Sequence, residues 1–204
     1  MKILQIKASV FNGSGQSSRL SDQLVAQLRA ENPGAQVVQR DLVSDPVPHL
    51  DAARVAAFFA KPDARTAEQN ALIAYSDALI DEVRQADVIV LGLPMYNFGV
   101  PSQLKAWFDH LARAGVTFKY TEKGAVGLLT GKKAYVVATR GGVYAGTPHD
   151  FEVPFVRQFL GFIGITDVEL VFAEGLALGE ESAKKSIAAA QAQVRGLSAI
   201  RIAA

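Results

Sequence analysis

The chain has 204 residues, a formal net charge of +1, 50% hydrophobic residues and no cysteine. The length fits one domain, and the balanced charge argues against a nucleic-acid-binding protein or a disordered charged tail. The lack of cysteine excludes disulfides, thiolate nucleophiles and iron–sulfur clusters, so any redox chemistry requires a bound cofactor. We expect a single domain over residues 1–204 that acts in the cytoplasm, without a membrane span or a nucleic-acid partner.

Five apolar runs rich in β-branched residues predict strands. They cover residues 2–6, 36–40, 88–93, 132–139 and 168–173. The run 88–93 shows no apolar/polar alternation, which is typical of a parallel strand that is covered on both faces.

Helical spacing of apolar residues fills the segments between these strands. The predicted helices cover 17–30, the region around 72–83, 102–111, 154–163 and 181–194, with Gly34 and Gly164 as helix stops. The alternation of strands and helices predicts an α/β fold, a flavodoxin-like three-layer sandwich with a five-stranded parallel sheet in the order 2-1-3-4-5. Residues 42–65 and 112–131 form two long irregular insertions in this scheme, of the kind that supplies lids, binding loops or dimer contacts.

The first strand is followed by a loop rich in glycine and serine, residues 8–19. Backbone N–H groups at a helix N-terminus beside serine hydroxyls make a phosphate site, with Ser9 and Ser17 as the first choices for hydroxyl donors. Ser17 or Ser18 could instead only cap the helix. The run 13–18 also reads G-x-G-x-x-S, a weak match to a dinucleotide fingerprint with Asp41 as the ribose carboxylate, but the third glycine is missing.

Two further loops follow the third and fourth predicted strands. Residues 94–101, PMYNFGVP, supply apolar surface and an amide, and residues 139–144, TRGGVY, supply two glycines whose N–H groups are open to a ring. Either could be an ordinary turn. The three loops end neighbouring strands at one sheet edge, and together they predict a flavin site.

Separated blocks of the sequence resemble the FMN-dependent NADH azoreductases, also described as FMN-dependent NADH:quinone oxidoreductases. The blocks are PMYNF at 94–98, QLK at 103–105, ARAGVTF at 112–118, YTE at 120–122, TGKK at 130–133, RGG at 140–142 and FLGFIGITD at 159–167. The resemblance spans essentially the whole chain and is more specific than any single loop.

The resemblance implies an FMN phosphate at Ser9, Gly15, Gln16 and Ser17. It implies an isoalloxazine ring against Met95, Tyr96, Asn97 and Phe98 on one side and Thr139, Arg140, Gly141 and Gly142 on the other. The chain departs from the family, which more often has S-x-S where Gly15-Gln16-Ser17 stands and S-R-G-G where Thr139 begins. We expect the Gly15 N–H to remain available and Thr139 to retain an alcohol.

The family resemblance also implies a homodimer with FMN at the subunit interface, where the partner chain closes the pocket. Phe118, Tyr120 and Phe162 are the candidates for that substrate wall, although each could equally belong to the core. Phe162 also falls on a helical apolar face with Phe155 and Phe159.

The implied reaction is a ping-pong two-electron reduction of quinones or azo compounds by NADH or NADPH, with hydride passing through flavin N5. No side chain is required as an acid or base, and no catalytic residue is assigned. His49, His110 and His149 lack metal-ligand spacing, and no G-x-S-x-G nucleophile motif is present. Two alternatives are an electron-carrier flavoprotein without nicotinamide turnover, which would commonly be strongly acidic, and a structural or regulatory flavodoxin-like domain without a cofactor.

Overall fold

A parallel five-stranded sheet forms the centre of the protein. The computed structural model describes residues 1–197, and residues 198–204 of the predicted domain lie outside the described residues. The strands are β1 (Lys2–Lys7), β2 (Gln36–Asp41), β3 (Val88–Pro94), β6 (Lys133–Thr139) and β7 (Asp167–Ala173). They lie in the order β2-β1-β3-β6-β7. Counted within this sheet, that is the predicted order 2-1-3-4-5, and each predicted strand differs from the observed one by a single residue at one end.

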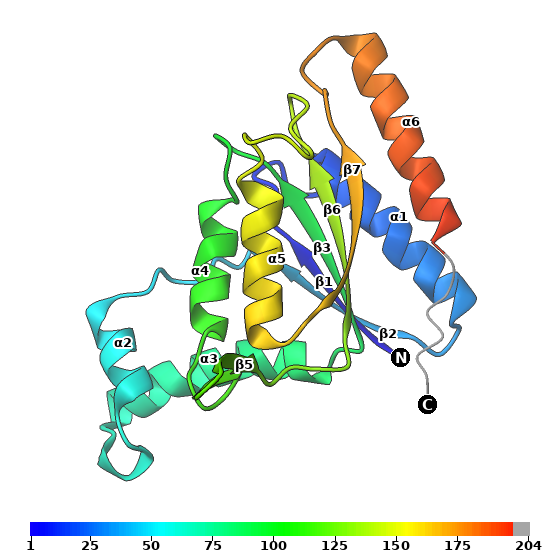
Figure 1. Cartoon of the computed structure of the whole chain (residues 1–204). Coiled ribbons are helices and arrows are strands. Elements are labelled where there is room, and N and C mark those ends of the chain that lie inside the picture. Colours follow the sequence, from blue (N-terminus) through cyan, green and yellow to red (C-terminus); the bar gives the residue numbers. More distant parts are fainter. Residues whose placement is uncertain (198–204) are drawn as a thin grey trace.

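Helices cover both faces of the sheet (Figure 1). One face carries α1 (Gln16–Glu31) and α6 (Glu180–Gly196), and the other carries α3 (Ala67–Gln85), α4 (Ser102–Leu111) and α5 (Glu152–Ile163). All of β3 is buried. Its residues alternate between the two cores, with Ile89 and Leu91 in one and Val88 and Val90 in the other. The prediction of a centrally covered third strand is therefore confirmed, and the molecule is an α/β sandwich of three layers.

The two predicted glycine stops have different outcomes. Gly164 ends α5 in the left-handed conformation at φ 107°, as expected for a helix-terminating glycine. Gly34 was the wrong choice, because α1 ends at Glu31 and Asn32 caps it. The Asn32 side chain donates to the carbonyl of Leu28 at 2.9 Å, and the residue before Pro33 is disfavoured in the helical region, so the helix stops earlier.

The prediction of two irregular insertions is wrong in detail, because both contain regular structure. The first holds α2 (Ala52–Phe59) and the short 3₁₀ turn η2 (Pro62–Ala64). Asp51 starts α2 by accepting a hydrogen bond from the Arg54 N–H at 2.8 Å. The second holds an antiparallel hairpin of β4 (Phe118–Thr121) and β5 (Gly124–Gly127), which pairs Thr121 with Gly124 across a two-residue turn.

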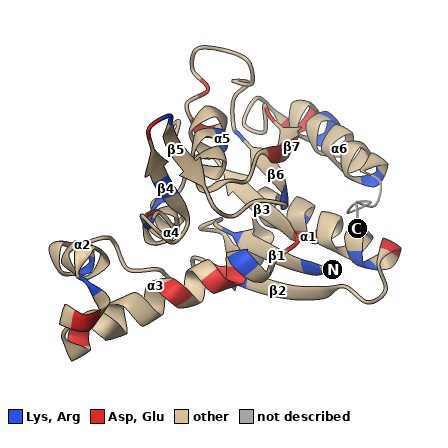
Figure 2. Cartoon of the chain, turned by 60° about the horizontal axis from the view of Figure 1, so that its bottom comes forward, with Lys and Arg blue, Asp and Glu red and all other residues tan. Residues whose placement is uncertain are grey.

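Charges on the long helices follow the helix dipole. Helix α3 has Glu68 in its first turn and Arg84 in its last, and α6 has acidic residues in its first turn and Arg195 in its last. Both signs are present on each of these two helices (Figure 2). Within residues 1–197, no helix combines the length and apolar character needed to cross a membrane.

Strand register brings three strand ends together. Lys7 in β1 pairs with Gly92 in β3, and Pro94 in β3 pairs with Thr139 in β6. The loops that leave β1, β3 and β6 therefore meet at one edge of the sheet, where ligands of open α/β sheets bind.

Candidate active site

Two adjoining cavities lie at this edge, and Met95 and Gly141 line both of them. The first has a volume of about 200 Å³ and the second about 240 Å³. The first is lined by Ser9, Phe11, Gly15, Gln16, Ser17, Pro94, Met95, Tyr96, Thr139, Arg140, Gly141 and Leu176. The second is lined by Met95, Asn97, Phe98, Gly141, Gly142 and Tyr144. All of the cofactor-binding residues predicted from the sequence line one cavity or both.

The start of α1 provides free donors at the first cavity. Among residues 1–197, the N–H groups of Gln16, Ser17 and Ser18 donate to no acceptor of the protein, and Gly15 at the N-cap supplies no side chain. The Ser17 hydroxyl is buried and has no hydrogen-bond partner in this part of the chain. These groups fit a phosphate, because an anion at a helix N-terminus satisfies unpaired donors and meets the positive end of the dipole.

The expectation of a free Gly15 N–H is wrong. This group donates to the Asn12 carbonyl at 3.3 Å, within the 3₁₀ turn η1 (Asn12–Ser14). Gly15 matters for another reason: a Cβ atom there would lie 2.1 Å from the Ser9 hydroxyl oxygen. Any residue with a side chain at position 15 would require Ser9 to move. Glycine, where the family more often has serine, therefore allows the loop after β1 to approach the start of α1 closely.

Tyr96 links the first two loops. Its hydroxyl accepts from the Val10 N–H at 3.2 Å and lies 3.4 Å from the Ser9 hydroxyl. The next residues make a tight turn in which Tyr96 and Gly99 exchange backbone hydrogen bonds. Asn97 and Phe98 at its centre have φ values of 50° and 67°. A bulky residue at positive φ costs of order 1 kcal/mol or more, and such strain clusters at ligand sites.

The third loop is held by the segment after β7, which the sequence reasoning missed. The backbone N–H groups of Gly175, Leu176 and Ala177 donate to the carbonyls of the 140–142 segment at 2.8–3.1 Å. Leu176 consequently lines the first cavity, together with Phe11, another residue that was missed. The N–H groups of Gly141 and Gly142 donate to no acceptor within residues 1–197, so they remain available to a ligand.

Tyr144 is a further residue that the sequence reasoning did not select. It lines the second cavity, and its ring lies 5.5 Å from that of Phe98 in an edge-to-face arrangement. It lies two residues after the glycine pair in the same loop. This position was the only feature of the sequence that could have indicated its place at the site. The aromatic pair joins the second loop to the third.

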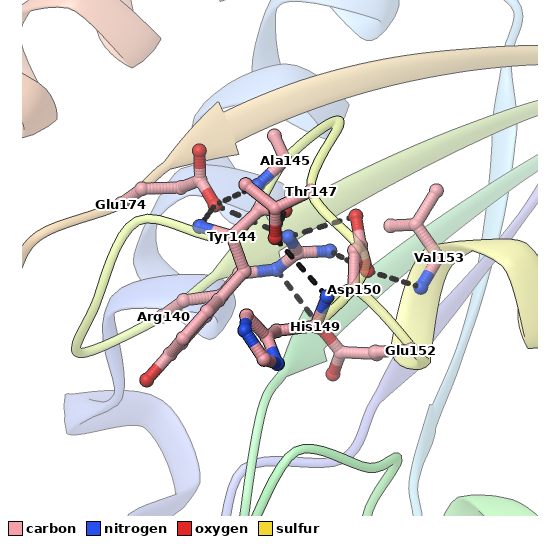
Figure 3. A network of polar contacts seen from close by, with 9 residues as sticks. All are labelled: Arg140, Tyr144, Ala145, Thr147, His149, Asp150, Glu152, Val153 and Glu174. Atoms are coloured by element: carbon pink, nitrogen blue, oxygen red, sulfur yellow. Dashed lines mark hydrogen bonds and ion pairs between the residues drawn. The ribbon is translucent and has the colours of Figure 1, made fainter.

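The Arg140 side chain is fully enclosed in an ionic cluster (Figure 3). It donates to both oxygens of Asp150 at 2.9 and 3.0 Å, to Glu152 at 3.2 Å and to Glu174 at 3.1 Å. The guanidinium therefore fixes the loop from inside the protein, although Arg140 also lines the first cavity. Bidentate pairing with a carboxylate is the strongest form of such an interaction.

Glu152 is the most perturbed carboxyl group of this cluster. Burial raises its pKa to about 8, against the opposing attraction of Arg140, and the nearby Asp150 raises it further. One of its oxygens is buried without a partner. Burial is the main cause of this rise, and one guanidinium shared among three carboxylates offsets only part of it.

The three residues predicted for a substrate wall lie together, but not at these cavities. The Phe118 and Phe162 rings are 4.2 Å apart, and Tyr120 lies 5.5 Å from Phe118 and is 75% exposed. Helix α5 starts beside Arg140 and runs away from the cavities, so Phe162 lies about 15 Å along it from Glu152 (Figure 1). These residues therefore do not line the cavities of the same chain.

Asp41 and His110, which were considered for a ribose contact and a metal site, both have partners within the protein. Asp41 accepts from the Val43 and Ser44 N–H groups at 3.0 and 3.3 Å, so its carboxylate caps a turn. His110 is buried, its Nε2 lies 3.0 Å from the Pro48 carbonyl, and burial lowers its pKa.

Comparison with known proteins identifies the family. Residues 1–197 match the model of a family described by a flavodoxin-like fold. The FMN-dependent NADH:quinone oxidoreductase of Alcanivorax borkumensis is 57% identical over 194 residues, which are 95% of this chain and 98% of that protein.

Solved structures agree with this assignment. An azoreductase from Bacillus anthracis str. Sterne has a TM-score of 0.89 at 30% identity, covering 97% of this chain and 98% of its own. An FMN-dependent NADH-azoreductase from Bacillus anthracis str. Ames Ancestor, solved in complex with FMN, has a TM-score of 0.84 at 25% identity, covering 97% and 99%. The resemblance seen in the sequence is confirmed: this chain belongs to the family of FMN-dependent NADH:quinone oxidoreductases, the flavodoxin-like enzymes that include the azoreductases.

Proposed function

We propose that this protein is an FMN-dependent NAD(P)H oxidoreductase that reduces quinones and azo compounds by two electrons. The observation that carries the proposal is the convergence of three separate loops on two cavities that share Met95 and Gly141. Each loop supplies a different chemistry: anion donors, apolar surface with an amide, and bare backbone N–H groups. The names and cofactor of the family's other members support the same assignment.

The phosphate of FMN binds at the start of α1. The N–H groups of Gln16 and Ser17 and the hydroxyls of Ser9 and Ser17 donate to it. Gly15 has no side chain, so Ser9 can lie close to the start of α1 and nothing separates the helix end from the ligand.

The ring lies between the second and third loops. Met95, Tyr96 and Phe98 supply its apolar surroundings, Asn97 supplies an amide, and Gly141 and Gly142 donate their N–H groups to its polar edge. When bound, FMN supplies the redox chemistry, accepting hydride at N5 from the nicotinamide and passing two electrons to the second substrate in ping-pong order. The chain's own residues bind and orient the reactants, and none is assigned as an acid or base.

The pocket is completed by a second copy of the chain. The exposed apolar side chains Phe11, Phe98 and Val143, which lie in the three loops that form the cavities, support a covering partner. Phe118, Tyr120 and Phe162 form one aromatic group remote from their own cavities, so they serve as a substrate wall only from the partner subunit. We also propose that the protein acts in the cytoplasm.

The proposal is tested by FMN titration and steady-state turnover of the full chain. We expect FMN fluorescence to be quenched at a stoichiometry of one per chain, and NADH oxidation to depend on added menadione or methyl red. FMN binding without turnover by either nicotinamide would support the electron-carrier alternative. A chain that binds no FMN would support the domain without a cofactor.

Ser17→Ala tests the phosphate end of the site. We expect FMN affinity to fall about ten-fold or more, because a hydrogen bond to a charged group is lost. The stability of the FMN-free protein should not fall, since the Ser17 hydroxyl has no protein partner among residues 1–197. Isothermal titration and thermal denaturation measure the two effects.

Ser18→Ala is the matched control for this substitution. Its hydroxyl is also buried and also has no partner in the described chain, but Ser18 lines neither cavity. Equal losses of FMN affinity in the two variants would contradict the assignment of Ser17.

A further inference from the structure

We infer that Glu174 is a positioning residue for the flavin site, an inference that rests on the proposed function. Glu174 follows β7 directly and lines neither cavity. It acts by fixing the loop that carries Gly141 and Gly142, the two residues proposed to donate N–H groups to the ring.

One oxygen of Glu174 makes three contacts with this loop. It accepts from the Tyr144 N–H at 2.8 Å, from the Ala145 N–H at 2.9 Å and from the Arg140 guanidinium at 3.1 Å (Figure 3). The contacted groups lie on both sides of the glycine pair. The carboxylate thus holds both ends of the Arg140–Ala145 segment, whose middle has the conformational freedom of two adjacent glycines.

The other anchors of this part of the loop are the backbone hydrogen bonds from the segment after β7 to the carbonyls of residues 140–142. The glycine carbonyls accept from Ala177 and Gly175, but no hydrogen bond of the described chain uses the glycine N–H groups. Tyr144 is also the residue whose ring meets Phe98 of the second loop. Release of Tyr144 and Ala145 would therefore free one wall of the second cavity and leave the neighbouring glycine pair held only through its carbonyls.

The contacts of Glu174 show that it does more than pair with the charge of Arg140, because they differ from those of Asp150 and Glu152. Its side chain is 14% exposed, and its charge faces Arg140, which also contacts Asp150 and Glu152. Asp150 directs its carboxylate to the Val153 N–H at the start of α5, 3.2 Å away, so it anchors the far end of the loop. Of the three carboxylates, Glu174 is the one that accepts hydrogen bonds from backbone N–H groups next to the second cavity.

The test compares Glu174→Ala with Glu174→Gln. We expect Glu174→Ala to weaken FMN binding about ten-fold or more, because hydrogen bonds that involve a charged group are lost. Glu174→Gln should recover most of the affinity, since the amide oxygen can accept from the same donors. A raised KM for the quinone with a smaller change in kcat would accompany the loss, because the ring is misplaced.

Hydrogen exchange of the FMN-free protein provides a readout that is independent of activity. The Tyr144 and Ala145 amides should be protected in the wild-type chain and exchange faster in Glu174→Ala. The matched control is Glu169→Ala, which removes a carboxylate of β7, the strand before Glu174, from its ion pair with Lys133 at 2.9 Å. It should leave FMN affinity and the exchange of both amides unchanged.

The outcomes separate this inference from the proposed function. If the wild-type chain binds FMN and Glu174→Ala binds it with the same affinity, the inference about Glu174 is overturned and the proposed function stands. A wild-type chain that does not bind FMN would overturn the proposed function and the inference with it. If Glu174→Ala does not fold, Glu174→Asp decides the matter, because it keeps the charge but withdraws the oxygen by one methylene: weakened FMN binding supports the inference, and unchanged binding overturns it.

Discussion

Glu152→Gln is expected to stabilise the protein above pH 8 by a few kcal/mol, with a much smaller effect near pH 5. Burial raises the pKa of this carboxyl group to about 8 in the folded protein, from its ordinary value of 4.5. Between these values the folded state keeps a proton that the unfolded state has released. The free energy of unfolding therefore falls as the pH rises through this window, at about 1.4 kcal/mol per unit of pKa shift.

Glutamine has a similar shape and no charge, so the variant lacks this loss of stability. Denaturant unfolding of both proteins at intervals from pH 5 to pH 9 measures the difference. Glu169→Gln is the control, because Glu169 lies in a half-buried ion pair with Lys133 outside this cluster and should give a pH profile parallel to that of the wild type. Parallel profiles for Glu152→Gln and the wild type would show that Glu152 is ionised in the folded protein at neutral pH.

Gly127→Ala is expected to destabilise the protein by about 3 kcal/mol or more, since overpacking against backbone leaves no side chain that could move aside. A Cβ atom at position 127 would lie 2.0 Å from the Gly164 nitrogen and 2.3 Å from the Ile163 carbonyl carbon. Strand β5 and the end of α5 would have to separate. The neighbouring hydrogen bond from the Leu129 N–H to the Ile163 carbonyl, 2.8 Å long, would be strained as well.

Thermal denaturation measures this effect, with an expected fall in Tm of roughly 6–12 °C for a domain of this size. Gly161→Ala in the adjacent α5 is the control, because a Cβ atom there meets nothing within 4 Å. It should be neutral or stabilising by up to about 1 kcal/mol, the usual gain for alanine over glycine in a helix. An unchanged Tm in Gly127→Ala would mean that the hairpin is not packed against α5 in solution.

The candidate site was predictable to the extent that it depends on strand ends. A parallel sheet places the loops after β1, β3 and β6 at one edge, so residues from Ser9 to Gly142 could be grouped from their order in the sequence alone. The segment after β7 escaped this reasoning, because Leu176 and Glu174 belong to the loop of an edge strand with no motif of its own. The role of the Arg140 side chain escaped it as well: the same residue type suits a ligand phosphate and a buried carboxylate equally.

The sequence by itself determined the alternation of strands and helices, the central position of residues 88–93 and the family, because these depend on local periodicity and on residues whose order is fixed along the chain. Only the tertiary structure decided which backbone donors stay free, that three carboxylates share the Arg140 guanidinium, and that Phe118 and Phe162 lie far from the cavities of the same chain. Those features depend on distances between segments that are far apart in the sequence. Such distances are set by how helices and loops pack on the sheet, which local patterns do not encode.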